Sequence, residues 1–123
     1  MNESSLQVVL PMPETEFLSK RGPLPVHPED MRHTQRLYFR TKATLRMLST
    51  LPTIRRQEVE CIVYTRDISR GGIGFLLHEQ LFPCEQVALD LPQFGNVVVT
   101  VTSCRYIGPA CFEIGASFTS TSE

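Results

Sequence analysis

The sequence predicts an all-β protein: a six-stranded antiparallel β-barrel with an irregular N-terminal extension. Short stretches in which apolar and polar residues alternate recur at regular spacing between residues 43 and 118. Turn-forming residues such as Gly71, Pro92 and Pro109 separate these stretches. No convincing helix pattern interrupts the series, so a barrel built from successive hairpins is the expected architecture.

Three segments are expected along the chain. Residues 1–31 are predicted to be a proline-rich extension, because prolines interrupt any long regular element there. Within it, residues 6–10 could pair as a short edge strand and residues 14–20 could form a brief helix. Residues 32–119 are expected to be the barrel domain, and residues 120–123 a polar tail.

The first three barrel strands follow from local patterns. Alternation over residues 43–47 predicts a strand with one buried face. Residues 59–64 predict a second strand, whose apolar centre suggests burial on both faces. Residues 67–72 contain Asp, Ser and two glycines and predict a turn, because these side chains bond to their own backbone and glycine tolerates unusual dihedral angles. Residues 73–77 are the expected third strand.

The remaining strands form the second half of the predicted barrel. Residues 86–91 alternate cleanly and end at a proline, which cannot continue a central strand. Residues 97–106 are the longest expected strand, and the inward-facing set changes parity after residue 101, which predicts a β-bulge. A hairpin at residues 108–109 leads into the final strand, residues 112–118.

Composition excludes several classes of protein. No apolar stretch approaches the ~20 residues of a membrane helix, and the first residues lack the basic and apolar regions of a secretory signal. We therefore expect a cytoplasmic protein without membrane insertion. The four cysteines form no C-x-x-C pair, and the three histidines have no metal-ligand spacing around them. Neither a metal site nor structural disulfides are expected.

Positive charge is concentrated in the middle of the chain. Residues 32–70 contain nine Lys or Arg against three Asp or Glu, a net charge of +6. Residues 1–31 carry −3 and residues 71–123 carry −4, which makes the total −1. Part of this excess is expected to be solvated strand-face charge. Its position nevertheless indicates a local anionic partner rather than a polyanion that covers the whole surface.

Two short stretches within this basic segment look like halves of one anion site. Arg36 and Arg40 offer two guanidinium groups, which pair bidentately with phosphate or with a guanine edge. Asp67 can accept hydrogen bonds from purine N–H groups, and Ser69 can hold a phosphate. Each residue also has a purely structural interpretation, as a solvated arginine or a self-capping turn. Together they predict a site for a guanine nucleotide with more than one phosphate.

The order Arg-x-x-x-Arg and then Asp-x-Ser-x-x-Gly resembles the PilZ domain family, whose members bind the bacterial second messenger cyclic di-GMP. The resemblance covers about residues 32–119 and implies a six-stranded barrel. It implies that Arg36 and Arg40 clamp guanine edges and phosphates. It further implies that Asp67 contacts a guanine, Ser69 contacts a phosphate and Gly72 shapes the turn.

The register of the arginine motif has an alternative, because Arg32 and Arg36 have the same spacing. The Arg36 and Arg40 register is preferred, since an aromatic pair precedes Arg40 and a strand follows it, and Arg32 then becomes an auxiliary contact. Many relatives carry an arginine next to the first one, where this chain has Gln35. That departure leaves open whether one ligand or a stacked ligand dimer binds.

The resemblance implies a single-domain cyclic di-GMP receptor. We expect a regulatory protein that changes conformation on binding and signals through an unidentified effector protein. The alternative is a PilZ-like interaction module that does not bind nucleotide. A basic barrel for single-stranded nucleic acid is disfavoured by the lack of aromatic residues in a basic groove. No nucleophile–base or paired-carboxylate arrangement is visible, so neither an enzyme nor a cofactor is expected. Many relatives close one barrel opening with a C-terminal helix, and here the extension is expected to cover that opening.

Overall fold

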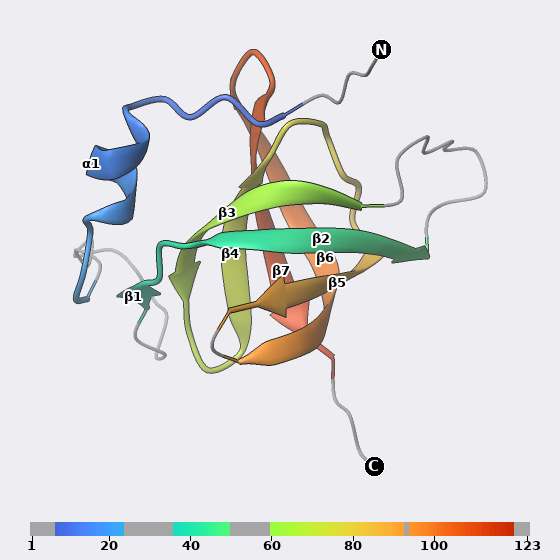
Figure 1. Ribbon diagram of the computed structural model, residues 1–123. Helices are drawn as coiled ribbons and strands as arrows, with labels where there is room; N and C mark the ends of the chain where they lie inside the picture. The colour runs from blue at the N-terminus through green and yellow to red at the C-terminus, as the bar shows by residue number, and fades with distance from the viewer. Residues whose placement is uncertain (1–6, 24–35, 50–59, 93, 120–123) are drawn as a thin grey trace, which may run out of the picture.

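The computed structural model describes residues 7–23, 36–49, 60–92 and 94–119 (Figure 1). This part of the chain contains one short helix, α1 (Glu14–Leu18), and seven strands. The strands are β1 (Leu37–Tyr38), β2 (Lys42–Ser49), β3 (Glu60–Ile68), β4 (Gly72–Leu77), β5 (Gln86–Leu91), β6 (Gly95–Gly108) and β7 (Cys111–Phe118).

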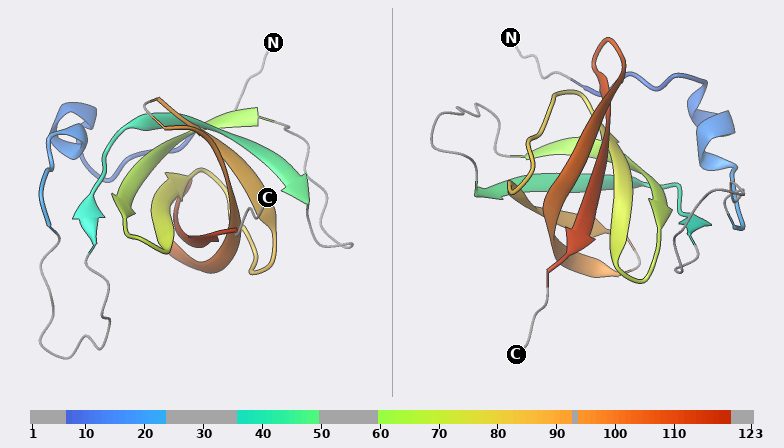
Figure 2. Two further views of the ribbon diagram at one scale, coloured as in Figure 1. Left: turned by 90° about the horizontal axis from the view of Figure 1, so that it is seen from below. Right: turned by 180° about the vertical axis from the view of Figure 1, so that it is seen from behind.

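Six of these strands close into an antiparallel barrel, which confirms the predicted fold class. The order around the barrel is β2, β3, β4, β7, β6 and β5, and β5 pairs back with β2. The view into the barrel in Figure 2 shows this ring of strands, with α1 outside it. Strand β1 is additional: it pairs with the end of β3, where Tyr38 lies opposite Asp67.

The interior of the barrel is filled by the alternating apolar side chains that the sequence indicated. Leu45, Phe75 and Leu89 come from three different strands and are fully or almost fully buried. Strand β5 has the predicted bounds, and α1 lies within the predicted helical stretch. Alternation works well as a signal here because each strand has one face in this single core.

The predicted turn at residues 67–72 is shorter in the structure. Strand β3 continues through Asp67 and Ile68, and β4 begins at Gly72. The strand extends because both of its edges have partners there: β1 on one side and β4 on the other. Sequence patterns around Asp, Ser and Gly indicate a turn correctly, but they do not report this pairing, which involves distant residues.

Two β-bulges lie on strands that border the same region of the outer wall. In β3 the register shifts between Thr65 and Asp67, so that Arg66 is the extra residue. In β6 the register shifts between Val101 and Ser103, within the strand where a bulge was predicted. The bulge in β3 was not predicted. A bulge changes which face the following side chains occupy.

Residues 7–23, the N-terminal strap, lie against the outer wall of the barrel. Phe17 of α1 is 2% exposed and packs with Leu76 and Cys111. Leu76 faces outward, since its neighbours Phe75 and Leu77 belong to the interior core. The strap therefore covers an outer face, where the sequence had suggested a cover over a barrel opening.

The expected edge strand at the start of the strap does not form in its described part. Residues 7–10 have no regular structure, although the Val9 amide donates to the Ala110 carbonyl oxygen at 2.9 Å. The start of α1 is held by polar contacts with the barrel. The Tyr64 hydroxyl donates to Glu14 Oε2 at 2.7 Å, and Lys42 Nζ lies 3.5 Å from the same oxygen.

The barrel core, rather than the exposed aromatic residues, should dominate stability. Phe75→Ala removes a fully buried ring and should lower the free energy of unfolding by ~3–5 kcal/mol. Phe94→Ala truncates a ring that is 60% exposed and should cost less than ~1.5 kcal/mol. Urea denaturation of both variants checks this, and equal losses would contradict the assignment of the core.

The contact between Glu14 and Tyr64 should be visible in the titration of the tyrosine. Burial, and then the hydrogen bond to Glu14, raise the pKa of Tyr64 to about 12. The neutral phenol is therefore favoured in the folded state, and its contribution to stability is lost as the pH rises from ~10 through about 12. Glu14→Ala should lower this pKa without restoring the ordinary value, because burial remains. Carbon NMR of the Tyr64 ring measures it, and an unchanged pKa would contradict the contact.

Candidate functional site

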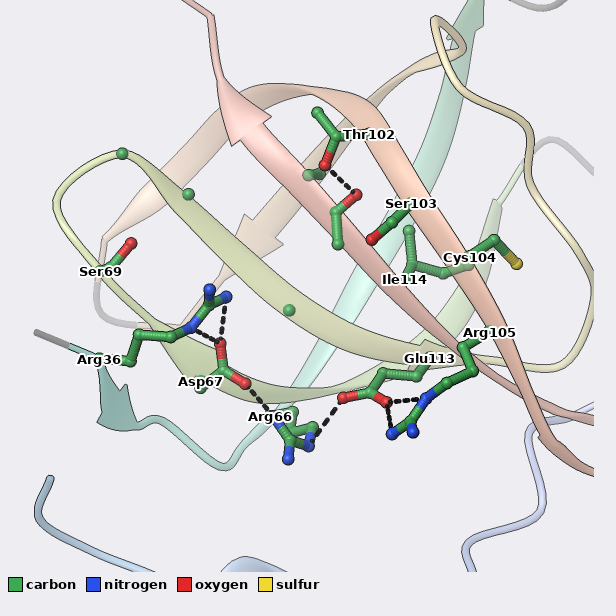
Figure 3. A pocket seen from close by; sticks show the side chains of 15 residues that line it. Arg36, Arg66, Asp67, Ser69, Thr102, Ser103, Cys104, Arg105, Glu113 and Ile114 are labelled. Atoms are coloured by element: carbon green, nitrogen blue, oxygen red, sulfur yellow. Dashed lines mark hydrogen bonds and ion pairs between the residues drawn. The ribbon is translucent and has the colours of Figure 1, made fainter. Parts of the chain in front are cut away.

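A cavity of about 650 Å³ opens on the outer wall of the barrel, across β3, β4, β7 and β6 (Figure 3). Its lining comprises residues of both sequence motifs and residues of neither. They are Arg36, Arg66, Asp67, Ser69, Gly71, Gly72, Gly74, Thr102, Ser103, Cys104, Arg105, Glu113, Ile114, Gly115 and Ala116.

The two bulges supply the polar walls of this cavity. In a regular strand, neighbouring side chains point to opposite faces. The bulge at Arg66 places both Arg66 and Asp67 on the cavity side, although Thr65 faces the interior. The bulge in β6 does the same for Thr102 and Ser103 on the facing side. Because of the two bulges, two pairs of neighbouring side chains face the same cavity: Arg66 with Asp67, and Thr102 with Ser103.

Glycines form the floor between these walls. Gly74 and Gly115 lie opposite each other on β4 and β7. A Cβ at Gly74 would lie 3.2 Å from both carboxylate oxygens of Asp67, and one at Gly115 would lie 2.5 Å from Ser103 Oγ. Any larger residue would push into the polar groups above. The floor is therefore backbone, and the Asp67 carboxylate and the Ser103 hydroxyl lie close above it.

Gly72 has a steric role in addition to its place in the turn. A Cβ at this position would lie 2.4 Å from the Ala116 carbonyl oxygen, a distance that real side chains do not reach. Its φ is not positive, so its place in the turn does not depend on an unusual backbone conformation. Gly72 instead allows β4 and β7 to pair tightly at the end of the cavity.

The carboxylate of Asp67 is the centre of the site. Arg36 donates to Asp67 Oδ1 from Nε at 3.1 Å and from Nη2 at 2.8 Å. Arg66 Nη1 donates to the other oxygen, Oδ2. The Asp67 side chain is only 2% exposed, whereas Arg36 is 27% exposed. A buried acid thus holds two guanidinium groups at the edge of the cavity.

The ion pairs continue beyond Asp67 along the rim, as Figure 3 shows. Arg66 Nε lies 3.0 Å from Glu113 Oε2, and Arg105 Nε donates to Glu113 Oε1 at 3.1 Å. Three guanidinium groups therefore alternate with two carboxylates, and the net charge of this row is +1. The row fixes the orientation of each arginine and leaves an excess of positive charge for an anionic ligand.

Ser69 lines the cavity from the turn between β3 and β4. Its backbone amide donates to the Gly72 carbonyl oxygen at 2.9 Å, which closes the turn. Figure 3 places the Ser69 side chain on the same side of the cavity as Arg36. The predicted residues Arg36, Asp67, Ser69 and Gly72 are thus brought together.

Arg40 does not line this cavity. Its Nε donates to the Arg66 carbonyl oxygen at 3.0 Å, and its Nη1 donates to the Phe17 carbonyl oxygen at 3.3 Å. The guanidinium carbon lies 4.1 Å from the centre of the Phe17 ring and 4.9 Å from that of Tyr38. Burial lowers the pKa of Arg40, and the charge of Arg66 lowers it further. The two predicted arginines therefore have separate partners in this structure.

Some predictions for the site concern residues outside the described part of the chain, and others were incomplete. Arg32, the predicted auxiliary contact, lies outside the described residues. Sequence reasoning did not single out Arg66, Arg105 or Glu113, which form most of the rim. Arg66 was noted only as one of the nine basic residues between residues 32 and 70. The bulge predicted in β6 was the one feature of the sequence that indicated the wall formed by Thr102 and Ser103.

Comparison with protein-family models agrees with these observations. The model of the PilZ domain matches residues 32–123, which is most of the chain. The chain belongs to the PilZ domain family. These domains are regulatory binders of cyclic di-GMP rather than enzymes. A search among curated proteins finds no match.

Two further findings concern the residues that the structure describes. No group of three or more His, Cys, Asp or Glu among them is arranged to hold a metal ion. No helix in the same residues is both long and apolar enough to cross a membrane.

The ion pairs at the two ends of the rim should differ in strength. A double-mutant cycle with Arg36→Ala and Asp67→Ala should give a coupling of ~1.5–3 kcal/mol, because the acid is buried. The matched cycle with Arg105→Ala and Glu113→Ala should give less than ~1 kcal/mol, because Arg105 is 72% exposed. Urea denaturation measures both. Equal couplings would mean that Asp67 does not organise the site.

Proposed function

We propose that this protein is a receptor for cyclic di-GMP and that the ligand binds in the outer-wall cavity. The observation that carries the proposal is the convergence of the two family motifs there. Arg36 from the first motif is held by Asp67 from the second, beside Ser69 and above a glycine floor. The PilZ family provides the identity of the ligand.

The groups around the cavity suit a molecule that carries guanines and phosphates. Guanidinium forks on Arg36 and Arg66 can pair with phosphate oxygens or with the O6 and N7 atoms of guanine. The Ser69 hydroxyl can donate to a phosphate oxygen. The cavity floor at Gly74 and Gly115 carries no side chain of its own, so a ligand there would meet the Asp67 carboxylate and the Ser103 hydroxyl.

Asp67 has two possible roles toward this ligand. Both of its oxygens accept hydrogen bonds from arginines in the structure. It can therefore act as a positioning residue that aims Arg36 and Arg66 at the ligand. For the guanine contact that the resemblance implies, a purine N–H can bond to the second acceptor site of Oδ2, which accepts one bond in the structure, or to an oxygen that a guanidinium has left. In either role, the loss of Asp67 disorganises the arginines.

Binding through both predicted arginines requires a rearrangement. Arg36 is already at the cavity, whereas Arg40 contacts Phe17 and must turn to reach a ligand there. Because Arg40 follows the pairing of β1 with β3, its movement would alter this segment of the surface. We propose that the altered surface is what an effector protein recognises. A cytoplasmic location agrees with a soluble second messenger as ligand.

One observation favours the alternative of an interaction module that does not bind nucleotide. Both oxygens of Asp67 already accept hydrogen bonds from arginines of the row, and Arg40 donates to the Arg66 carbonyl oxygen outside the cavity. A domain of this kind could retain the arginines for structural reasons alone. The net positive charge of the row favours the receptor, because a purely structural network does not need it.

Isothermal titration calorimetry with cyclic di-GMP tests the proposal. The cyclic ligand should bind with a dissociation constant in the micromolar range or below, and linear pGpG and GTP should bind more weakly. Arg36→Ala should weaken binding at least ~10-fold, which corresponds to ~1.4 kcal/mol. Arg36→Lys should not restore binding, because an ammonium group lacks the planar fork.

Arg46→Ala is the matched control, since Arg46 is an exposed arginine on β2 outside the cavity lining. It should leave the affinity unchanged. No heat with any of the three nucleotides would support the interaction module instead. Equal losses in the Arg36 and Arg46 variants would show that only total charge matters, and would contradict a site at the cavity.

A further inference from the structure

The N-terminal strap is bonded to the segment that carries the two predicted arginines, although it lies outside the residues that the family model matches. Arg40 donates to the Phe17 carbonyl oxygen, and its guanidinium carbon lies over the Phe17 ring. The Tyr38 amide donates to the Gly22 carbonyl oxygen at 2.8 Å. The strap thus contacts the arginine segment through both a side chain and the backbone.

The strap is also anchored to the barrel by contacts of its own, which keep it beside the arginine segment. The Phe17 ring lies edge-on to the Tyr64 ring, with centroids 5.9 Å apart, and is buried against Leu76 and Cys111. The Tyr64 hydroxyl and Lys42 both contact Glu14 at the start of α1. These contacts hold Phe17 where Arg40 meets it.

Among the described residues, the groups that hold Arg40 are neutral. They are two carbonyl oxygens and the faces of two aromatic rings. No carboxylate among the described residues forms an ion pair with Arg40. A phosphate group would be a stronger partner, because hydrogen bonds between two charged groups are shorter and stronger than those to neutral acceptors. An anionic ligand can therefore compete with these neutral groups for Arg40.

We propose that the strap is an intramolecular competitor for Arg40 that restrains ligand binding. This rests on the proposed function, in which Arg40 takes part in holding cyclic di-GMP. Arg40 can contact a ligand in the cavity only after it has left Phe17. Docking of the strap and binding of the ligand through Arg40 are then mutually exclusive at this one side chain.

Such competition couples ligand binding to the outer face of the barrel that Phe17 of the strap covers. Linkage requires that a weaker strap raise the affinity for the ligand by the same factor by which the ligand loosens the strap. Loosening the strap would expose the outer face formed by Tyr64, Leu76 and Cys111, which Phe17 covers. The strap thus supplies a route from ligand binding to an apolar surface that is otherwise hidden.

Two full-length variants weaken the strap to different extents. Phe17→Ala removes the ring beneath Arg40 together with the buried anchor, and it lies outside the main core of the barrel. Tyr64→Phe removes only the hydroxyl that bonds Glu14 and keeps the ring contact with Phe17. Tyr106→Phe is the matched control, because Tyr106 is 63% exposed and its ring contacts Phe112, which does not belong to the cluster around Phe17.

The affinity for cyclic di-GMP is measured by calorimetry for all four proteins. Phe17→Ala should bind about 10-fold more tightly than the unaltered protein, as expected for the loss of a cation–π contact and its anchor. Tyr64→Phe should bind ~2- to 5-fold more tightly, and Tyr106→Phe equally. Hydrogen exchange supplies the second readout: ligand should accelerate exchange at the Phe17 amide, which donates to the Pro13 carbonyl oxygen.

The outcomes separate this proposal from the proposed function. If the unaltered protein binds the ligand, but Phe17→Ala binds equally or more weakly and exchange at Phe17 is unchanged, the strap is not a competitor and the receptor remains. If neither the unaltered protein nor any variant binds, the receptor function fails, and this proposal fails with it. Binding seen only after Phe17→Ala would support strong competition by the strap.

Discussion

The site depends on one interaction: the buried carboxylate of Asp67 shared by Arg36 and Arg66. The acid has little access to water, and the cost of burying its charge is offset because two guanidinium groups bond to its oxygens. The same contacts determine where the two arginines point. Gly74 leaves room for this carboxylate, since a Cβ there would press against both oxygens. Asp67 thus takes part both in the packing of the site and in the orientation of the arginines that are proposed to bind the ligand.

The barrel and the N-terminal strap are two packing units with different consequences. The interior core of the barrel unites residues from all six barrel strands and keeps the walls of the cavity in place. The strap contributes a small, separate cluster around Phe17 on the outer wall. A small cluster can open at a lower free-energy cost than a main core. That difference makes the strap, and not the barrel, the element suited to move.

The sequence predicted much of the fold because each barrel strand has one face in a single core. Alternating patterns therefore predicted β5 at its observed bounds and the irregularity of β6. The patterns could not show that β3 continues through Asp67, since that depends on its pairing with β1 and β4. They also could not show the bulge at Arg66, because nothing in the local sequence distinguishes it from a regular strand.

The candidate site was predictable in part, from a resemblance rather than from physical pattern alone. The motifs named Arg36, Asp67, Ser69 and Gly72, and the structure brings these four residues together. The position of Arg40 could not be foreseen, because it depends on Phe17, a residue of the strap that no motif includes. Glu113 and Arg105 also escaped notice, since only strand pairing brings them to Arg66. Strand β4 pairs with both β3 and β7, and β7 places Glu113 opposite Arg105 on β6.

The most direct test of the account is an NMR titration of the labelled protein with cyclic di-GMP that maps the backbone amides. The largest shifts should fall on Ser69, Gly74, Ser103 and Gly115, around the floor and walls of the outer cavity. Amides on the β2 and β5 side, such as those of Arg46 and Asp90, should remain unchanged. Shifts centred on that opposite side, or saturable binding without any shift at Gly74 and Gly115, would contradict it.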